Sequence, residues 1–139
     1  MGAYELIDHT ADIGFRLKAD GLKRLFAGSA TAMFAIIAER KRSAGLSQSK
    51  KFIFDFKESS LEELYIAWLR ELISLSDCEN VIFKRFQIDK IDQGQLQAKA
   101  LGYPRRHFHI IREIKAVTYH DLKVEKQGKF YKAEVIFDV

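Results

Sequence analysis

The segment from residue 60 to residue 80 constrains the fold more than any other part of the chain. Ser60 and Glu63 form the Ser-x-x-Glu pattern of a capping box, which satisfies free backbone N–H groups at the start of a helix. Apolar residues then recur at helical spacing: Leu61, Leu64, Tyr65, Trp68, Leu69, Leu72 and Leu75. A stripe this broad must pack against another apolar surface. The sequence therefore predicts a helix that begins at Leu61, ends between Asp77 and Asn80, and lies on a sheet.

Segments on both sides of this helix alternate with the period of a strand. Residues 13–19 and 51–57 alternate between apolar and polar side chains, which is typical of half-buried strands. A first helix is predicted from Leu22, with Asp20 as its cap and the cations of residues 40–42 near its end, where they suit the helix dipole. Further strands are predicted over residues 81–89, 95–101, 107–111, 116–124 and 130–137. This order indicates an α+β fold with both helices packed on one side of a largely antiparallel sheet.

Composition narrows the class of protein. The chain has 139 residues, of which 47% are apolar and 30% charged, and this balance favours a single globular domain over residues 1–139. No apolar run reaches bilayer length, no signal peptide is evident, and Cys78 is the only cysteine. We therefore expect a cytoplasmic protein with no membrane partner. The net charge of +4 permits contact with RNA without requiring it.

Common catalytic motifs are missing from the sequence. It contains no Gly-x-Gly, no Cys-x-x-Cys and no Gly-x-Ser-x-Gly. A metal-dependent hydrolase is the least favoured function, because no nucleophile or base beyond carboxylates is evident.

A basic cluster lies late in the chain, at Arg105, Arg106 and Arg112, together with His107 and His109. The arginines are the best candidates for contact with RNA phosphates or with a partner. The two histidines would share one face of a strand and present imidazoles to a metal, although no third ligand is evident nearby. A solvated strand edge is the simpler alternative for the whole cluster.

Two aspartates occupy similar places near the two ends of the chain. Asp12 precedes the first predicted strand and Asp138 ends the last one. Each carboxylate could accept backbone N–H groups in a turn. Alternatively, the two chain ends lie side by side, and a cation or a proton between the carboxylates relieves their repulsion. Hard oxygen donors, including the α-carboxylate of Val139, would then select Ca²⁺, Mg²⁺ or Mn²⁺.

The strand predicted over residues 116–124 has no cleanly apolar face, because Thr118, Tyr119 and His120 stand among its core residues. A strand of this kind either borders a polar site or has a solvent-exposed edge. Both alternatives are open on the sequence.

Four short motifs together resemble the archease family. They are HTADIG at residues 9–14, WLRELISL at 68–75, EIKAVTYH at 113–120 and VIFDV at 135–139. The resemblance extends from Tyr4 to Val139, with the motifs in the order and spacing of the family. It implies a small α+β cofactor protein rather than an enzyme.

The resemblance also implies a partner. Archeases assist the GTP-dependent tRNA-splicing ligase, which joins RNA ends bearing a 2′,3′-cyclic phosphate or 3′-phosphate to a 5′-hydroxyl. They promote guanylylation of the ligase on a histidine and allow multiple turnover. An older proposal for the family, and the alternative for this chain, is a tRNA-binding chaperone of a tRNA cytosine methyltransferase.

The family carries a divalent metal, expected to be Ca²⁺, with Mg²⁺ and Mn²⁺ as alternatives. By motif its ligands would be Asp12, Asp138 and Val139, supported by His9 and Lys115. The chain departs from the family at Gly102-Tyr103, where members often have Gly-Glu, and arginines follow soon after. This difference would alter how the surface meets a partner.

Overall fold

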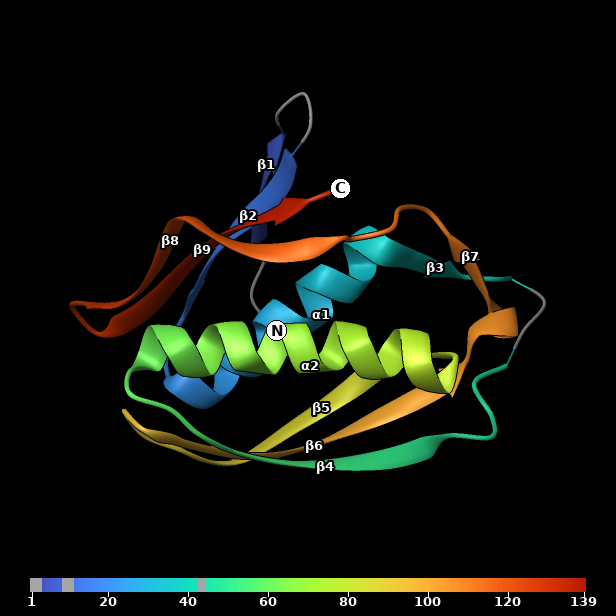
Figure 1. The fold of residues 1–139 in the computed structure, drawn as a ribbon, viewed down its shortest axis with the longest axis horizontal. Coiled ribbons are helices and arrows are strands. Elements are labelled where there is room, and N and C mark those ends of the chain that lie inside the picture. The colour runs from blue at the N-terminus through green and yellow to red at the C-terminus, as the bar shows by residue number, and fades with distance from the viewer. Residues whose placement is uncertain (1–3, 9–11, 43–44) are drawn as a thin grey trace.

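Two helices lie between two antiparallel sheets in the computed structural model of the chain, which describes residues 4–8, 12–42 and 45–139 (Figure 1). The elements in chain order are β1 (Tyr4–Asp8), β2 (Asp12–Ala19), α1 (Leu22–Ile37), β3 (Ala38–Arg40), β4 (Lys50–Lys57), α2 (Leu61–Glu79), β5 (Val81–Ile91), β6 (Gln95–Pro104), η1 (Arg105–His107), β7 (Phe108–Ile110), β8 (Ala116–Gln127) and β9 (Phe130–Asp138). The strand orders are β1-β2-β9-β8 in the upper sheet, β4-β6-β5 in the lower sheet and β3-β7 in a short ribbon.

This architecture confirms the predicted α+β class with two helices and antiparallel strands. The strands divide among three sheets, where the sequence pattern indicated one. Figure 1 shows the reason, because α1 and α2 have the upper sheet above them and the lower sheet below. A helix between two sheets needs apolar residues on more than one face, and eight residues of α2, including Ile66, are buried. No helix in the described ranges is long and apolar enough to span a bilayer.

Helix α2 forms where the sequence predicted it. The Ser60 Oγ accepts a hydrogen bond from the Glu63 N–H at 3.2 Å, which satisfies a donor of the first turn. At the other end Asn80 adopts a left-handed conformation with φ of 57°, and its N–H donates to the Ser76 carbonyl. In the core, Trp68 Nε1 donates to the Phe26 carbonyl oxygen at 3.0 Å, which ties α2 to α1.

The ends of helix α1 differ from the prediction. The cap is Gly21, without a side-chain hydrogen bond, whereas Asp20 pairs through both oxygens with Arg24 one turn later. The helix ends at Ile37, and no basic residue lies in its last turn. Arg40 instead belongs to β3, opposite Phe108 of β7. The helix-dipole interpretation of residues 40–42 is therefore wrong, because strand pairing takes over at Ala38.

Candidate metal centre

Asp12 and Asp138 are directly opposite each other on adjacent antiparallel strands, β2 and β9. Ile13 and Phe137, their neighbours along these strands, are buried in the core. Since side chains alternate along a strand, both carboxylates lie on the face away from that core. Directly opposed residues have Cβ atoms about 4.5–5.5 Å apart. The structure thus places the first residue of β2 beside the last residue of β9.

Neither carboxylate is engaged by another described residue. The structure shows no hydrogen bond to the side chain of Asp12 or Asp138, and no cation within 4.0 Å of either, among residues 4–8, 12–42 and 45–139. The turn-capping alternative therefore has no support in that part of the chain. Two unneutralised carboxylates on one face form a donor set that fits a hard divalent cation.

Gly14 brings the two strands close enough for this arrangement. It lies opposite Ile136, two residues along each strand from the aspartate pair. A Cβ added to Gly14 would lie 2.1 Å from the carbonyl oxygen of Val135, which is far inside van der Waals contact. On the other side of β9, the Thr118 hydroxyl donates to the Ile136 carbonyl oxygen at 2.9 Å. The Gly of the HTADIG motif is thus required by the approach of β2 to β9.

Two of the other proposed site residues lie at the same corner. The Lys115 N–H donates to the carbonyl oxygen of Asp138 at 2.8 Å. Val139 follows immediately and packs against the core while partly exposed. His9 lies outside the described residues. In the described part of the chain no three His, Cys, Asp or Glu side chains gather around one point. Any ligands beyond the two aspartates would therefore be the Val139 carboxylate or residues outside the described ranges.

The basic cluster lies elsewhere, around η1 and the end of α2. Arg105 donates to Asp77 Oδ1 at 3.1 Å, and Arg106 donates to Gln48 Oε1. Arg112 lines a hollow of about 230 Å³ in which Asp77 and Glu113 also stand. Two of the three arginines are therefore already paired within the protein, which leaves Arg112 as the freest candidate for an RNA or partner contact.

The two histidines of this cluster are not presented together on one strand. His107 belongs to η1, and its Nδ1 is buried without a hydrogen-bond partner in the described ranges. His109 lies on β7 opposite Glu39. The His-x-His zinc alternative required both imidazoles on one strand face, so the local fold gives it no support.

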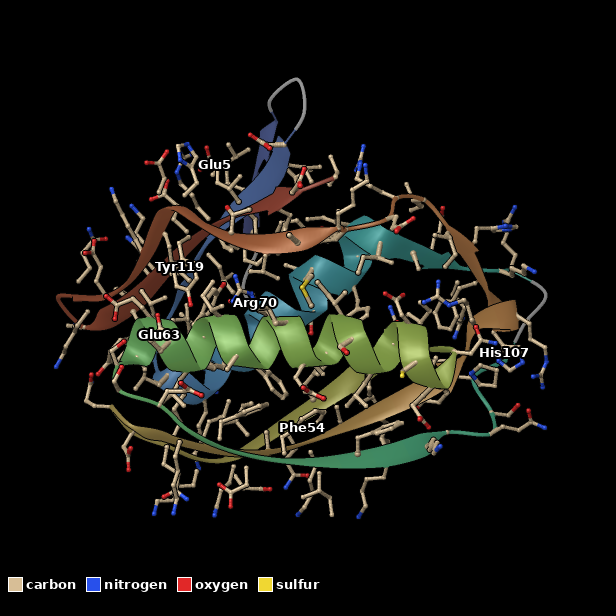
Figure 2. All side chains as sticks on the ribbon, viewed as in Figure 1. Glu5, Phe54, Glu63, Arg70, His107 and Tyr119 are labelled. Carbon is tan, nitrogen blue, oxygen red and sulfur yellow. The ribbon has the colours of Figure 1, made fainter. Side chains whose placement is uncertain are left out.

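One polar cluster was not predicted from the sequence. The Tyr119 hydroxyl donates to Glu63 Oε2 at 3.1 Å, and the Arg70 guanidinium lies 5.1 Å from the Tyr119 ring centroid (Figure 2). Partial burial, followed by the bond to Glu63, raises the pKa of Tyr119. Glu63 thus turns toward β8 instead of completing the capping box. The mixed character of residues 116–124 was the only signal in the sequence.

A bulge in β8 carries this cluster. Between Thr118 and Lys123 the strand advances five residues, while its partner β9 advances only from Ile136 to Glu134. Asp121 within the bulge has a φ of 52°. β-Bulges redirect side chains and are frequent beside functional sites. Here the bulge begins after Thr118, which pairs with Ile136 opposite Gly14, two residues along β9 from Asp138.

Comparisons with known proteins agree with the family resemblance of the four sequence motifs. The Archease protein family (MTH1598/TM1083) matches residues 4–139. The chain is 35% identical to protein archease of Methanosarcina barkeri over 142 aligned positions, covering 98% of this chain and 95% of the relative. It is 35% identical to protein archease of Pyrococcus abyssi over 132 positions, covering 91% and 90%.

Solved structures share the fold. The solution structure of Methanobacterium thermoautotrophicum protein 1598 matches with a TM-score of 0.77 and 28% identity over all of both chains. The crystal structure of an archease, possible chaperone, from Thermotoga maritima matches with a TM-score of 0.66 over 96% of this chain and 94% of that one. At 24% identity this second likeness concerns the fold alone. With the family matched from residue 4 to the last residue, the chain belongs to the archease family.

Proposed function

We propose that this archease is a non-enzymatic activator of a GTP-dependent tRNA-splicing RNA ligase. In this proposal it promotes guanylylation and turnover of the ligase, and Asp12, Asp138 and the α-carboxylate of Val139 hold a divalent cation, with Ca²⁺ expected. The observation that carries the proposal is the register of β2 and β9, which sets the two aspartates opposite each other. Membership of the family supports the assignment of the partner.

The residues of this chain would act by placing charge rather than by forming bonds. The β2–β9–β8 ladder holds the two carboxylates on one rigid face, and the Lys115 backbone fixes the carbonyl of Asp138. Preorganised charge is effective because no reorganisation is needed when the partner reacts. A divalent cation at this place would stabilise the charge that develops on phosphate oxygens during nucleotidyl transfer. No residue of this chain is assigned a catalytic role.

The test is a ligase guanylylation assay with Asp12→Asn and Asp138→Asn variants. We expect both variants to fold normally and to lose stimulation, because each removes a charged oxygen donor. Asp20→Asn is the matched control, since Asp20 is an exposed aspartate whose one ion-pair partner among the described residues is Arg24. Calorimetric titration with Ca²⁺, Mg²⁺ and Mn²⁺ provides a second readout that is independent of ligase activity. Full stimulation by both site variants would refute the proposal.

The alternative, a tRNA-binding chaperone of a tRNA cytosine methyltransferase, has weaker support. It relied on Arg105, Arg106 and Arg112, and the first two donate to Asp77 and Gln48. A methyltransferase that is kept soluble by wild-type protein but not by an Arg112→Gln variant would favour this alternative.

A further inference from the structure

Cations stand in adjacent rows on one face of the lower sheet. The register places Lys51 of β4 and Arg85 of β5 on either side of Leu101 in β6. In the next row of the same face, two residues along each strand, Lys99 of β6 lies opposite Ile53 of β4. Neighbouring strands are about 4.8 Å apart, so Lys51 and Arg85 begin roughly 10 Å apart, with Lys99 between them and one row away.

This face points to solvent. Phe54 is on the opposite side of β4, where its ring lies 5.2 Å from that of Trp68 in α2. Figure 1 shows both helices on that same side of the sheet, and Figure 2 shows Phe54 directed toward α2. Ile53, on the other side, is 74% exposed, the largest value among the exposed large hydrophobic residues. No described element covers the face that carries Lys51, Arg85 and Lys99.

The positive charge of these rows is only partly neutralised. Lys99 lies 3.4 Å from Asp89 Oδ2. Lys51 and Arg85 have no acidic partner within 4.0 Å in the part of the chain that the structure describes. By contrast, Arg16, Lys123 and Lys132 on the upper sheet share Glu134. The lower sheet therefore offers cations whose hydrogen-bond donors are free for an anion.

The same residues border a hollow of about 540 Å³, which Ser49 and Gln87 also line. Among the described residues that line it, Phe86 is the one aromatic residue, and that ring stacks on Phe34 with centroids 6.1 Å apart. Because no aromatic face is free to stack on a base, the hollow suits phosphates better than bases.

We infer that Lys51, Arg85 and Lys99 form a binding site for the phosphate backbone of RNA, independent of base sequence. The site lies on the lower sheet, whereas the aspartate pair lies on the upper one. It therefore goes beyond the proposed metal centre and the basic cluster at Arg105–Arg112. Only the choice of RNA among polyanions rests on the proposed function; the position of the site rests on register, exposure and charge.

The test measures binding of fluorescent oligouridylate to the isolated protein by anisotropy across a salt series. The test variant is Lys51→Gln/Arg85→Gln, and the matched control is Lys126→Gln/Lys129→Gln. The control residues are exposed cations of the β8–β9 hairpin without ion pairs in the described ranges, and both pairs remove the same charge. Three phosphate contacts give a slope of log K against log salt of about −2, and one contact gives about −0.7.

We expect the Lys51/Arg85 variant to show the shallower slope and the Lys126/Lys129 variant to keep the slope of wild type. Circular dichroism establishes that both variants are folded. In ¹⁵N spectra of wild type, the amides of Lys51, Arg85 and Lys99 should shift on addition of the RNA. Equal losses in the two variants, absence of binding at low salt, or shifts confined to other residues would each overturn the inference. No ligase is present, so failure of the activator proposal leaves this result unaffected.

Discussion

Arg16 Nε lies 2.7 Å from Glu134 Oε1 across the same β2–β9 ladder that carries Asp12 and Asp138. The Glu134 side chain is 13% exposed, and Lys123 and Lys132 lie within 4.0 Å of its other oxygen. Partial burial raises the pKa of Glu134, but the hydrogen bond and charge of Arg16, with the two lysines, outweigh it and lower that pKa. The same pair of strands thus carries Glu134, whose charge is neutralised by three cations, and Asp12 and Asp138, which have no cationic partner among the described residues.

The lowered pKa of Glu134 leads to a prediction about acid stability. The charged form is favoured in the folded state, so its contribution is present above the ordinary carboxyl pKa and is lost as the pH falls through the lower folded value. Glu134→Gln should cost about 1 kcal/mol at neutral pH and less in acid. Urea unfolding at several pH values measures this. A cost that does not diminish in acid would contradict the prediction.

Gly14→Ala should destabilise the protein by about 2–3 kcal/mol, because the added Cβ overlaps the Val135 carbonyl and forces β2 away from β9. Ligase stimulation should fall as well, since the same movement separates Asp12 from Asp138. Gly45→Ala is the control, because nothing lies within 4 Å of its added Cβ. Thermal unfolding of the two variants checks the prediction, and equal melting temperatures would show that β2 and β9 tolerate the side chain.

Asp138→Asn should stabilise the metal-free protein by about 0.5 kcal/mol, because it removes the repulsion between directly opposed like charges. Excess Ca²⁺ should raise the melting temperature of wild type and leave that of Asp138→Asn almost unchanged. Differential scanning fluorimetry with chelator and then with Ca²⁺ measures both effects. Asp89→Asn, which alters an aspartate of the lower sheet, should respond to Ca²⁺ as wild type does.

The contact between Tyr119 and Glu63 should appear as a coupling energy of about 0.5–1 kcal/mol in a double-mutant cycle of Tyr119→Phe and Glu63→Ala. The hydroxyl loses its acceptor in one variant and the carboxylate loses its donor in the other. Denaturant unfolding of wild type, the single variants and the double variant gives this energy. Additive effects would mean that the hydrogen bond contributes nothing to stability.

Ser60→Ala should cost about 1 kcal/mol, because the Glu63 N–H loses its capping acceptor. The neighbouring Ser59 is exposed and makes no side-chain hydrogen bond with the described residues, so Ser59→Ala is the matched control. Urea unfolding of the two variants compares them directly. Similar midpoints for both would count against a capping role for Ser60.

Short elements show where the sequence pattern was insufficient. β1 and β3 were not predicted, because three to five residues carry too little periodicity to be distinguished from a loop. Asp20 resembled a helix cap, but Arg24 lies one turn away and takes both of its oxygens. Each difference arises from a partner that the local sequence pattern does not identify.

Helix α2 could be derived from the chain alone, because its capping serine and its apolar stripe act within three or four residues of one another. The alternating strands β2 and β4 follow from the same local logic. The meeting of Asp12 with Asp138 was decided only by the tertiary structure. It depends on the register of two strands from opposite ends of the chain, and on a glycine at which those strands can approach. The alternation of apolar residues fixes which face of each strand is buried, but no turn joins β2 to β9, so their pairing is made only when the sheet assembles.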